Sequence, residues 1–98
     1  MNGTPKINWG DLSEREKSQV LGKYLFDGEY TRDFYFDFRI CFETLEKKFP
    51  RGFRWRPDNK LLICYENYDN PPTQIDCDTF EDGAWVILLR LAGVEVNY

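Results

Sequence analysis

The chain contains no histidine, and this absence removes several functions at once. Histidine is the commonest general base, the usual switch near neutral pH and the commonest metal ligand in proteins. The serines and threonines therefore have no visible partner for nucleophilic catalysis. No glycine-rich loop of the kind that cradles phosphate is present, because Gly28 and Gly52 stand alone. We expect neither an enzyme nor a cofactor.

Cysteine is scarce and shows no CxxC spacing, since the chain has only Cys41, Cys64 and Cys77. Each falls in a segment that we expect to be regular, so we interpret all three as small core residues with free thiols in a reducing compartment. A disulfide between two of them is the alternative. The carboxylates that start with Asp76 and Asp78 lack the spacing and turn glycine of a calcium loop, so we expect no metal site.

Long apolar runs are also missing. The N-terminus has no apolar run typical of a signal peptide, and no segment is long enough to span a membrane. We therefore expect a cytoplasmic protein, monomeric or weakly dimeric. The net charge of −4 argues against general binding to polyanions but leaves a local basic patch open.

What is present suits one domain that covers residues 1–98. Apolar residues make up 42% of the chain and aromatic residues 17%, which is ample for a single core. Each large aromatic side chain carries much apolar area, so a few of them fill a small core. Some aromatic residues are then left over for a binding surface.

The stretch from Asp78 to Gly93 predicts a helix around which the chain is organised. Thr79 with Asp82 three residues later resembles a capping box, and a glycine stands where a left-handed cap would end the helix. The helix is apolar almost all round, with four residues expected to face outward: Asp82, Gly83, Val86 and Arg90. A strand over residues 85–89 is the alternative, because short apolar runs are ambiguous.

Two further helices are expected in the first half of the chain. A complete capping box, Ser13 with Glu16, predicts a helix from Glu14 to Leu25. In residues 31–49, alternating phenylalanines indicate a strand, but the longer pattern has helical spacing and ends before a proline. We favour a helix capped by Thr31 or Asp33, with Tyr35 and Phe36 near its rim.

The second half contains three expected strands, over residues 53–56, 61–66 and 74–78. The first two form an antiparallel hairpin. The second is apolar on both faces, which predicts helices on both sides of the sheet. The fold class is therefore α+β: three helices packed on a small, mainly antiparallel three-stranded sheet, in the order helix, helix, strand, strand, strand, helix.

Three stretches resemble the phage ABA sandwich domain family, a group of small phage and prophage proteins without a settled activity. They are Ile7-Asn8-Trp9 up to the helix that ends at Leu25, Thr31-Arg32-Asp33, and Asp78-Thr79-Phe80-Glu81-Asp82 leading into Leu89-Arg90-Leu91-Ala92-Gly93-Val94-Glu95-Val96. The resemblance implies a phage origin, hence the host cytoplasm, and a fold, but no mechanism.

Charge is distributed unevenly along the second half. Residues 47–60 hold six basic residues against Asp58 alone, whereas residues 61–89 hold six acidic residues and no basic one. Two explanations fit this pattern equally well. Either the two regions are solvated and stabilise each other, or they form a surface used for recognition. Two hypotheses about function follow from the second explanation.

In the first hypothesis, the protein binds and inhibits a host protein by occlusion, plausible targets being a defence or nucleic-acid-processing factor. Acidic and aromatic side chains would bind the partner: Glu66, Asp69, Asp76, Asp78, Tyr35, Phe36 and Tyr68, with Tyr98 as a further anchor. In the alternative, a basic face binds nucleic acid or a nucleotide through Arg51, Arg54, Arg56 and Lys60. We favour the first hypothesis because the net charge is acidic.

Overall fold

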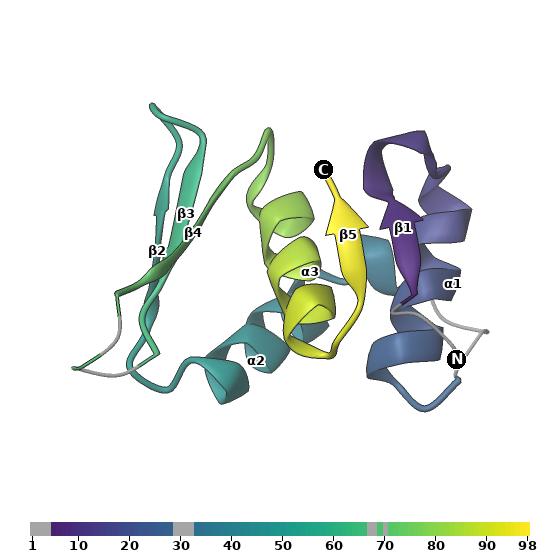
Figure 1. Ribbon diagram of the computed structural model, residues 1–98, viewed down its shortest axis with the longest axis horizontal. Coiled ribbons are helices and arrows are strands. Elements are labelled where there is room, and N and C mark those ends of the chain that lie inside the picture. The colour runs from purple at the N-terminus through teal and green to yellow at the C-terminus, as the bar shows by residue number, and fades with distance from the viewer. Residues whose placement is uncertain (1–4, 29–32, 67–68, 70) are drawn as a thin grey trace.

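The computed structural model describes residues 5–28, 33–66, 69 and 71–98. In chain order its elements are β1 (Lys6–Asn8), the 3-10 helix η1 (Trp9–Asp11), α1 (Glu14–Leu25), the 3-10 helix η2 (Phe34–Phe36), α2 (Phe38–Lys48), β2 (Phe53–Arg56), β3 (Leu61–Cys64), β4 (Thr73–Asp76), α3 (Phe80–Leu91) and β5 (Glu95–Asn97). The α+β class and the order of its three helices and three antiparallel strands are confirmed (Figure 1).

Helix α1 has the range that the sequence predicts. The hydroxyl of Ser13 accepts a hydrogen bond from the Glu16 N–H at 3.2 Å, and Glu16 Oε1 accepts one from the Ser13 N–H at 3.0 Å. This complete capping box fixes the first turn. The chain leaves the helix through Asp27 and Gly28, which have φ values of 55° and 83° and so make the left-handed turn.

Helix α2 begins later than predicted. Asp37 caps it, because its carboxylate accepts a hydrogen bond from the Ile40 N–H at 3.1 Å. The expected start at Asp33 is wrong, and Thr31 lies outside the described residues. The aromatic residues before Asp37 form the separate turn η2, in which Phe34 is buried and Phe36 is exposed. The break at Asp37 turns this segment away from the axis of α2.

The sheet has the strand order β2-β3-β4, antiparallel throughout. Its inner face, which carries Phe53, Trp55, Leu62, Cys64 and Ile75, packs toward the helices. The expected helix cover on the second face is wrong. That outer face carries two rows in which exposed polar residues lie beside an apolar one: Arg54–Ile63–Gln74 and Arg56–Leu61–Asp76. The long side chains next to Ile63 cover it, and no helix is needed to do so.

A second, two-stranded sheet joins the two ends of the described chain. β1 pairs with β5 in parallel, with Ile7 opposite Val96. This pair is not predicted from the sequence. Its strands have only three residues each and lie far apart in the sequence, so no local pattern predicts them.

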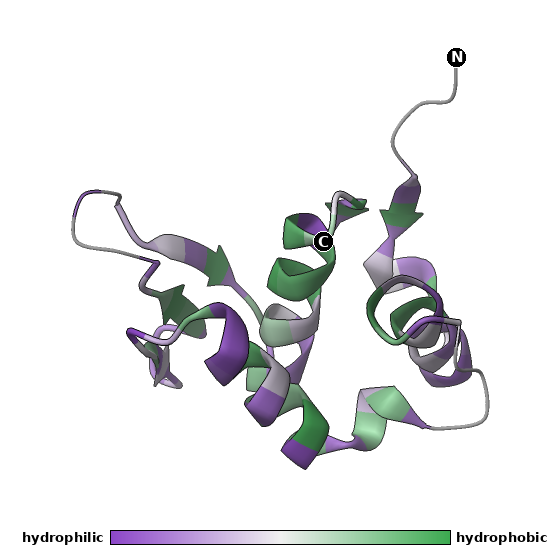
Figure 2. Ribbon diagram, turned by 90° about the horizontal axis from the view of Figure 1, so that it is seen from below, coloured by the Kyte–Doolittle hydropathy of each residue, from purple (hydrophilic) through white to green (hydrophobic). Residues whose placement is uncertain are grey.

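Helix α3 lies in the middle of the molecule, between the three-stranded sheet and the β1–β5 pair (Figure 1). Its ribbon is mostly hydrophobic in Figure 2, and every residue from Gly83 to Leu89 is buried. The outward positions predicted for Gly83 and Val86 are therefore wrong, because elements pack on more than one side of this helix. Within the described ranges, no helix has the length and apolar character needed to cross a membrane.

Candidate functional site

A group of aromatic side chains gathers where α2, β2 and the start of α3 meet. Phe38 and Phe42 are four residues apart and so lie on the same side of α2. Phe53 and Trp55 are two residues apart and share the inner face of β2. Phe80 is the first residue of α3. Three elements that are distant in sequence thus contribute to one surface.

The five rings form a connected network. Phe53 lies against Phe42 with ring centroids 5.1 Å apart and against Phe80 at 5.7 Å. Phe38 is 5.6 Å from Phe80 and 5.9 Å from Phe42, and Trp55 is 6.3 Å from Phe80. These tilted and edge-to-face pairs lie in the range favourable for aromatic contacts. The network gives the surface a defined shape.

A hollow of about 470 Å³ lies within this network and is also lined by Thr79 and Glu81. A smaller hollow of about 220 Å³ adjoins it, lined by Tyr35, Phe36 and three residues that line the first hollow as well: Phe38, Thr79 and Glu81. We call the two hollows together the aromatic groove. Phe36, Phe38 and Phe42 remain 61%, 49% and 37% exposed, so the groove is an apolar surface open to water.

The rim of the aromatic groove carries negative charge. Glu81 lines both hollows, and Asp37 caps α2 beside Phe38. Burial raises the pKa of Cys41 to about 12, and the charges of Glu81 and Asp37 add to this rise. An acidic side chain entering the groove would therefore be repelled.

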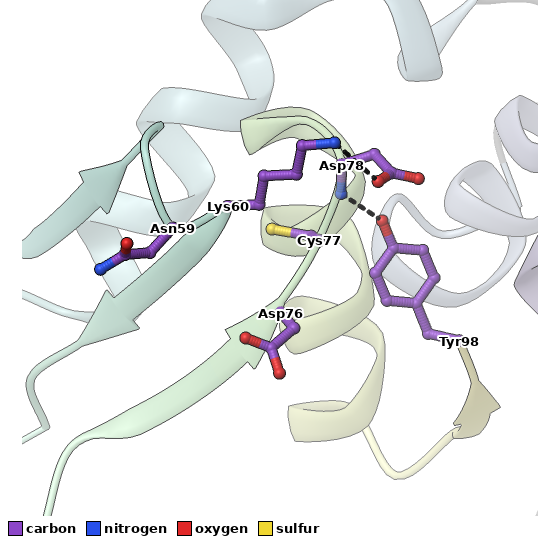
Figure 3. Close-up of a pocket in the computed structure, with 6 residues that line it drawn as sticks. All are labelled: Asn59, Lys60, Asp76, Cys77, Asp78 and Tyr98. Carbon is purple, nitrogen blue, oxygen red and sulfur yellow. Dashed lines mark hydrogen bonds and ion pairs between the residues drawn. The ribbon is translucent and has the colours of Figure 1, made fainter.

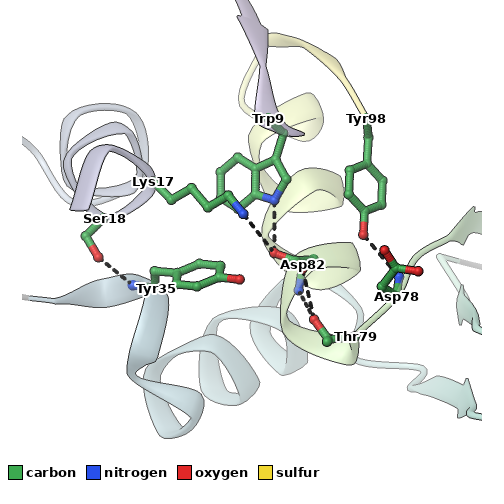
Figure 4. Close-up of polar contacts among 8 residues, drawn as sticks. All are labelled: Trp9, Lys17, Ser18, Tyr35, Asp78, Thr79, Asp82 and Tyr98. Carbon is green, nitrogen blue, oxygen red and sulfur yellow. Dashed lines mark hydrogen bonds and ion pairs between the residues drawn. The ribbon is translucent and has the colours of Figure 1, made fainter. Parts of the chain in front are cut away.

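A polar cluster beneath the groove fixes its η2 wall (Figure 4). The Tyr35 N–H donates to Ser18 Oγ at 3.0 Å, and Lys17 Nζ lies 4.8 Å from the centre of the Tyr35 ring. Asp82 accepts a hydrogen bond from Trp9 Nε1 at 3.0 Å and pairs with Lys17 at 3.7 Å. Burial, followed by the Asp82 carboxylate, raises the pKa of Tyr35 above its usual value. These contacts tie η2 to α1 and α3.

The acidic residues predicted to bind a partner do not join this groove. Glu66 lies just after β3, where it accepts a hydrogen bond from Thr73 Oγ1 at 3.3 Å. Asp76 lies on the outer face of the sheet, and Asp69 is exposed in the loop before β4. Tyr68 lies outside the described residues. Only Tyr35 and Phe36 of the predicted set line the groove.

Asp78 and Tyr98 belong to a separate hollow of about 350 Å³ on the other side of the start of α3 (Figure 3). Asp78 pairs with Lys60 at 3.7 Å, and its N–H donates to Tyr98 Oη at 3.2 Å. Lys60 was predicted to bind an anion and Asp78 to bind a basic partner, but here they neutralise each other.

The remaining basic residues of the alternative hypothesis are placed by β2. Arg54 and Arg56 are exposed on the outer face of the sheet, and Arg51 is exposed just before the strand. Asp76 shares that outer face, in the row of Arg56. One acidic residue thus lies on the same face as the two arginines, so the two regions of opposite charge are less separate in space than along the sequence.

Chemistry by a thiol or a metal has little support. Cys41, Cys64 and Cys77 are buried and free, which confirms their interpretation as core residues. Burial raises the pKa of Cys64 to about 12 and that of Cys77 to about 11, so all three thiols are protonated near neutral pH. Among the described residues, no group of three or more cysteine or carboxylate side chains is arranged to hold a metal ion.

Sequence reasoning missed most of the groove, because helical spacing made Phe38 and Phe42 look like core residues. The available signal was the number of aromatic residues, which exceeds what the core takes up. Comparison of the chain with protein-family models, curated proteins and solved structures finds no match. A proposal about the function of this protein therefore rests on the geometry of the groove.

Proposed function

We propose that this protein acts by binding: it recognises one partner protein through the aromatic groove and blocks the surface that it covers. The expected partner is a host protein, such as a defence or nucleic-acid-processing factor, by analogy with small phage proteins that block host complexes. Binding and occlusion need no catalytic group, in keeping with the residue types that the chain lacks.

One observation supports this proposal most strongly, namely the neighbouring exposed rings of Phe36, Phe38 and Phe42. Apolar surface in water costs about 25 cal/mol per Å², and covering these rings by a partner would recover that free energy. Contiguous apolar patches with polar rims are typical of interaction sites, and aromatic residues are common binding hot spots.

The polar cluster under η2 adds to the expected affinity. Lys17 and Asp82 have side chains only 14% and 13% exposed, so their ion pair is partly shielded from water. Together with the Tyr35 N–H bond to Ser18, it holds one wall of the groove in place before binding. A preformed surface loses less conformational entropy when a partner docks.

The nucleic-acid alternative has weaker support. Its arginines, Arg54 and Arg56, share the outer face with Asp76, and Lys60 is already paired with Asp78. A phosphate backbone would meet the Asp76 carboxylate on the same face, and that contact would be repulsive. No comparable opposition affects an apolar partner in the aromatic groove.

Partner capture from a bacterial lysate tests the proposal when the groove is altered. The tagged protein should retain one host protein, and the double variant Phe36→Ala/Phe38→Ala should lose it, because both anchors are exposed and their removal leaves the core intact. The matched control is Tyr65→Ala, since Tyr65 is also exposed but lies on the outer side of the sheet.

Two results would count against the proposal. In the first, the groove variant still retains the host protein, but a variant with Asp69, Asp76 and Asp78 changed to lysine loses it. This result would assign binding to the acidic residues. The other is recovery of a nucleotide or nucleic acid in place of a protein, with loss upon Arg54→Ala/Arg56→Ala.

A further inference from the structure

In the part of the chain that the structure describes, strand β2 pairs with β3 alone, so it leaves one edge of the three-stranded sheet open. The Tyr65 N–H donates to the Gly52 carbonyl at 3.0 Å, so these two residues form a hydrogen-bonded pair. Such pairs alternate with non-hydrogen-bonded ones in an antiparallel ladder. Arg54 therefore bonds to β3, whereas Phe53 and Trp55 direct their backbone N–H and C=O groups away from the sheet.

The two residues with outward backbone groups also line the aromatic groove. Phe53 and Trp55 have their side chains on the inner face, next to Phe80. A strand added beside β2 would bond to these two residues and place every second side chain at the groove. Its other side chains would lie on the outer face, beside Arg54 and Arg56. One added strand thus contacts two chemically different surfaces.

We propose that β2 accepts an extended segment of the partner protein as a fourth strand, and that this segment alternates apolar and acidic residues. Apolar side chains fit the groove, where the carboxylate of Glu81 opposes acidic ones. Acidic side chains fit the outer face, where Arg54 and Arg56 are exposed. The inference rests on the proposed function and names the chemistry of the partner segment.

A second copy of this chain fits the same edge less well. If two β2 strands paired in antiparallel fashion, Arg54 and Arg56 of one copy would lie opposite those of the other. Like charges directly opposite each other destabilise a strand pair. Charged residues on an edge strand commonly prevent self-pairing in this way. At the β2 edge, Arg54 and Arg56 therefore favour an acidic strand over a second copy of the chain.

Short synthetic peptides test the inference directly. The probe is a fluorescent peptide that alternates valine and glutamate, and the matched control replaces each glutamate with lysine. Binding is measured by fluorescence anisotropy on the whole protein. We expect the glutamate peptide to bind about fivefold more tightly, because each oppositely charged cross-strand pair is favourable. The double variant Arg54→Glu/Arg56→Glu should reverse this preference.

Backbone methylation of the peptide tests strand addition and leaves the protein unchanged. N-methylation removes donors on alternate residues, either the valines or the glutamates. Only one of these two sets points its N–H groups at β2. Methylation of that set alone should therefore weaken binding, by about tenfold for the lost hydrogen bonds. Amide hydrogen exchange of Phe53 and Trp55 should slow when the unmodified peptide is added, because their N–H groups become bonded.

Four results would overturn strand addition: equal weakening by both methylated sets, equal affinity for the glutamate and lysine peptides, no binding of either peptide, or dimers of the protein that the Arg54→Glu/Arg56→Glu variant disrupts. Failure of strand addition can also be told apart from failure of the proposed function. If Phe36→Ala/Phe38→Ala abolishes partner capture while Arg54→Glu/Arg56→Glu has no effect on it, the groove binds the partner without a strand at β2.

Discussion

Gly83 of α3 packs tightly against Ile75 and Cys77, at the end of β4. A Cβ atom at this position would overlap Cys77 Sγ and lie 3.3 Å from Ile75 Cγ2. We therefore expect Gly83→Ala to destabilise the protein by about 1–3 kcal/mol through overpacking. This is opposite to the gain of about 1 kcal/mol that alanine gives in an unhindered helix. Denaturant unfolding followed by circular dichroism measures the change.

Gly10 provides the control for this substitution, because nothing lies within 4 Å of a Cβ atom placed there. Gly10→Ala should alter the free energy of unfolding by less than about 0.5 kcal/mol. A Gly83→Ala variant as stable as the original protein, or more stable, would contradict the close packing of α3 on Cys77.

The environment of single residues was only partly predictable. The helical period identifies the apolar positions of α3, but it cannot count how many elements surround the helix. Gly83 and Val86 were expected to face water and are buried. Gly83 lies against Cys77 and Ile75, and α1, α2 and β5 also pack on this helix. The role of Asp82 was likewise hidden, since its partner Trp9 is 73 positions away in the sequence.

The three thiols should be inert in the folded protein. Because burial raises the pKa of Cys41 to about 12, from an ordinary value of 9.0, ionisation favours the unfolded state as pH rises through this window. Stability from this thiol is fully present below pH 9 and falls above it. Labelling with a thiol reagent should find no rapid reaction at neutral pH and three reactive groups in denaturant. Rapid labelling of the native protein would contradict the burial.

At the scale of elements, α3 should be the most sensitive helix. Thr79 Oγ1 accepts a hydrogen bond from the Asp82 N–H at 3.2 Å, and Thr79→Ala should cost about 1 kcal/mol as the loss of an N-cap. Leu88 is 1% exposed, and Leu88→Ala should cost roughly 2–5 kcal/mol as a buried truncation. Unfolding in urea measures both. A smaller loss for Leu88→Ala than for Thr79→Ala would contradict the central position of α3.

Elements with strong local signals were predictable, and the others were not. The capping box of Ser13 and Glu16 set the start of α1 correctly, because both partners lie within one turn. The start of α2 was wrong, since several possible caps precede Phe38 in the sequence and Asp37 is the one whose carboxylate accepts the Ile40 N–H. The parallel β1–β5 pair depends on contacts between opposite ends of the chain, which no local window contains.

At the scale of the whole molecule, the aromatic groove was predictable in kind but not in place. The surplus of aromatic residues indicates a binding surface, and Tyr35 and Phe36 were assigned to it. The other members come from α2, β2 and α3, so their proximity depends on the tertiary fold. The unequal charge distribution along the chain was misleading, because the sheet places Asp76 on the same face as Arg54 and Arg56.

Binding through an apolar groove should depend weakly on salt. Displacing water from aromatic rings involves no release of counterions, unlike contacts to many phosphates, which weaken steeply as salt rises. We expect the affinity for the captured host protein to change little between low and physiological salt. Titrations monitored by calorimetry measure this dependence. A loss of affinity as steep as that of many phosphate contacts would instead favour nucleic acid bound by the arginines of the outer face.

Hydrogen exchange of the protein, alone and in complex with the captured host protein, tests most directly whether the aromatic groove is the binding surface. The groove predicts slower exchange in residues 36–42, 53–56 and 79–81 of the complex, because a partner shields these backbone segments from water. Residues 73–76, on the far strand of the sheet, should exchange at the same rate in both states. Protection confined to residues 73–76, with residues 36–42 and 53–56 unchanged, would contradict the assignment of binding to the groove.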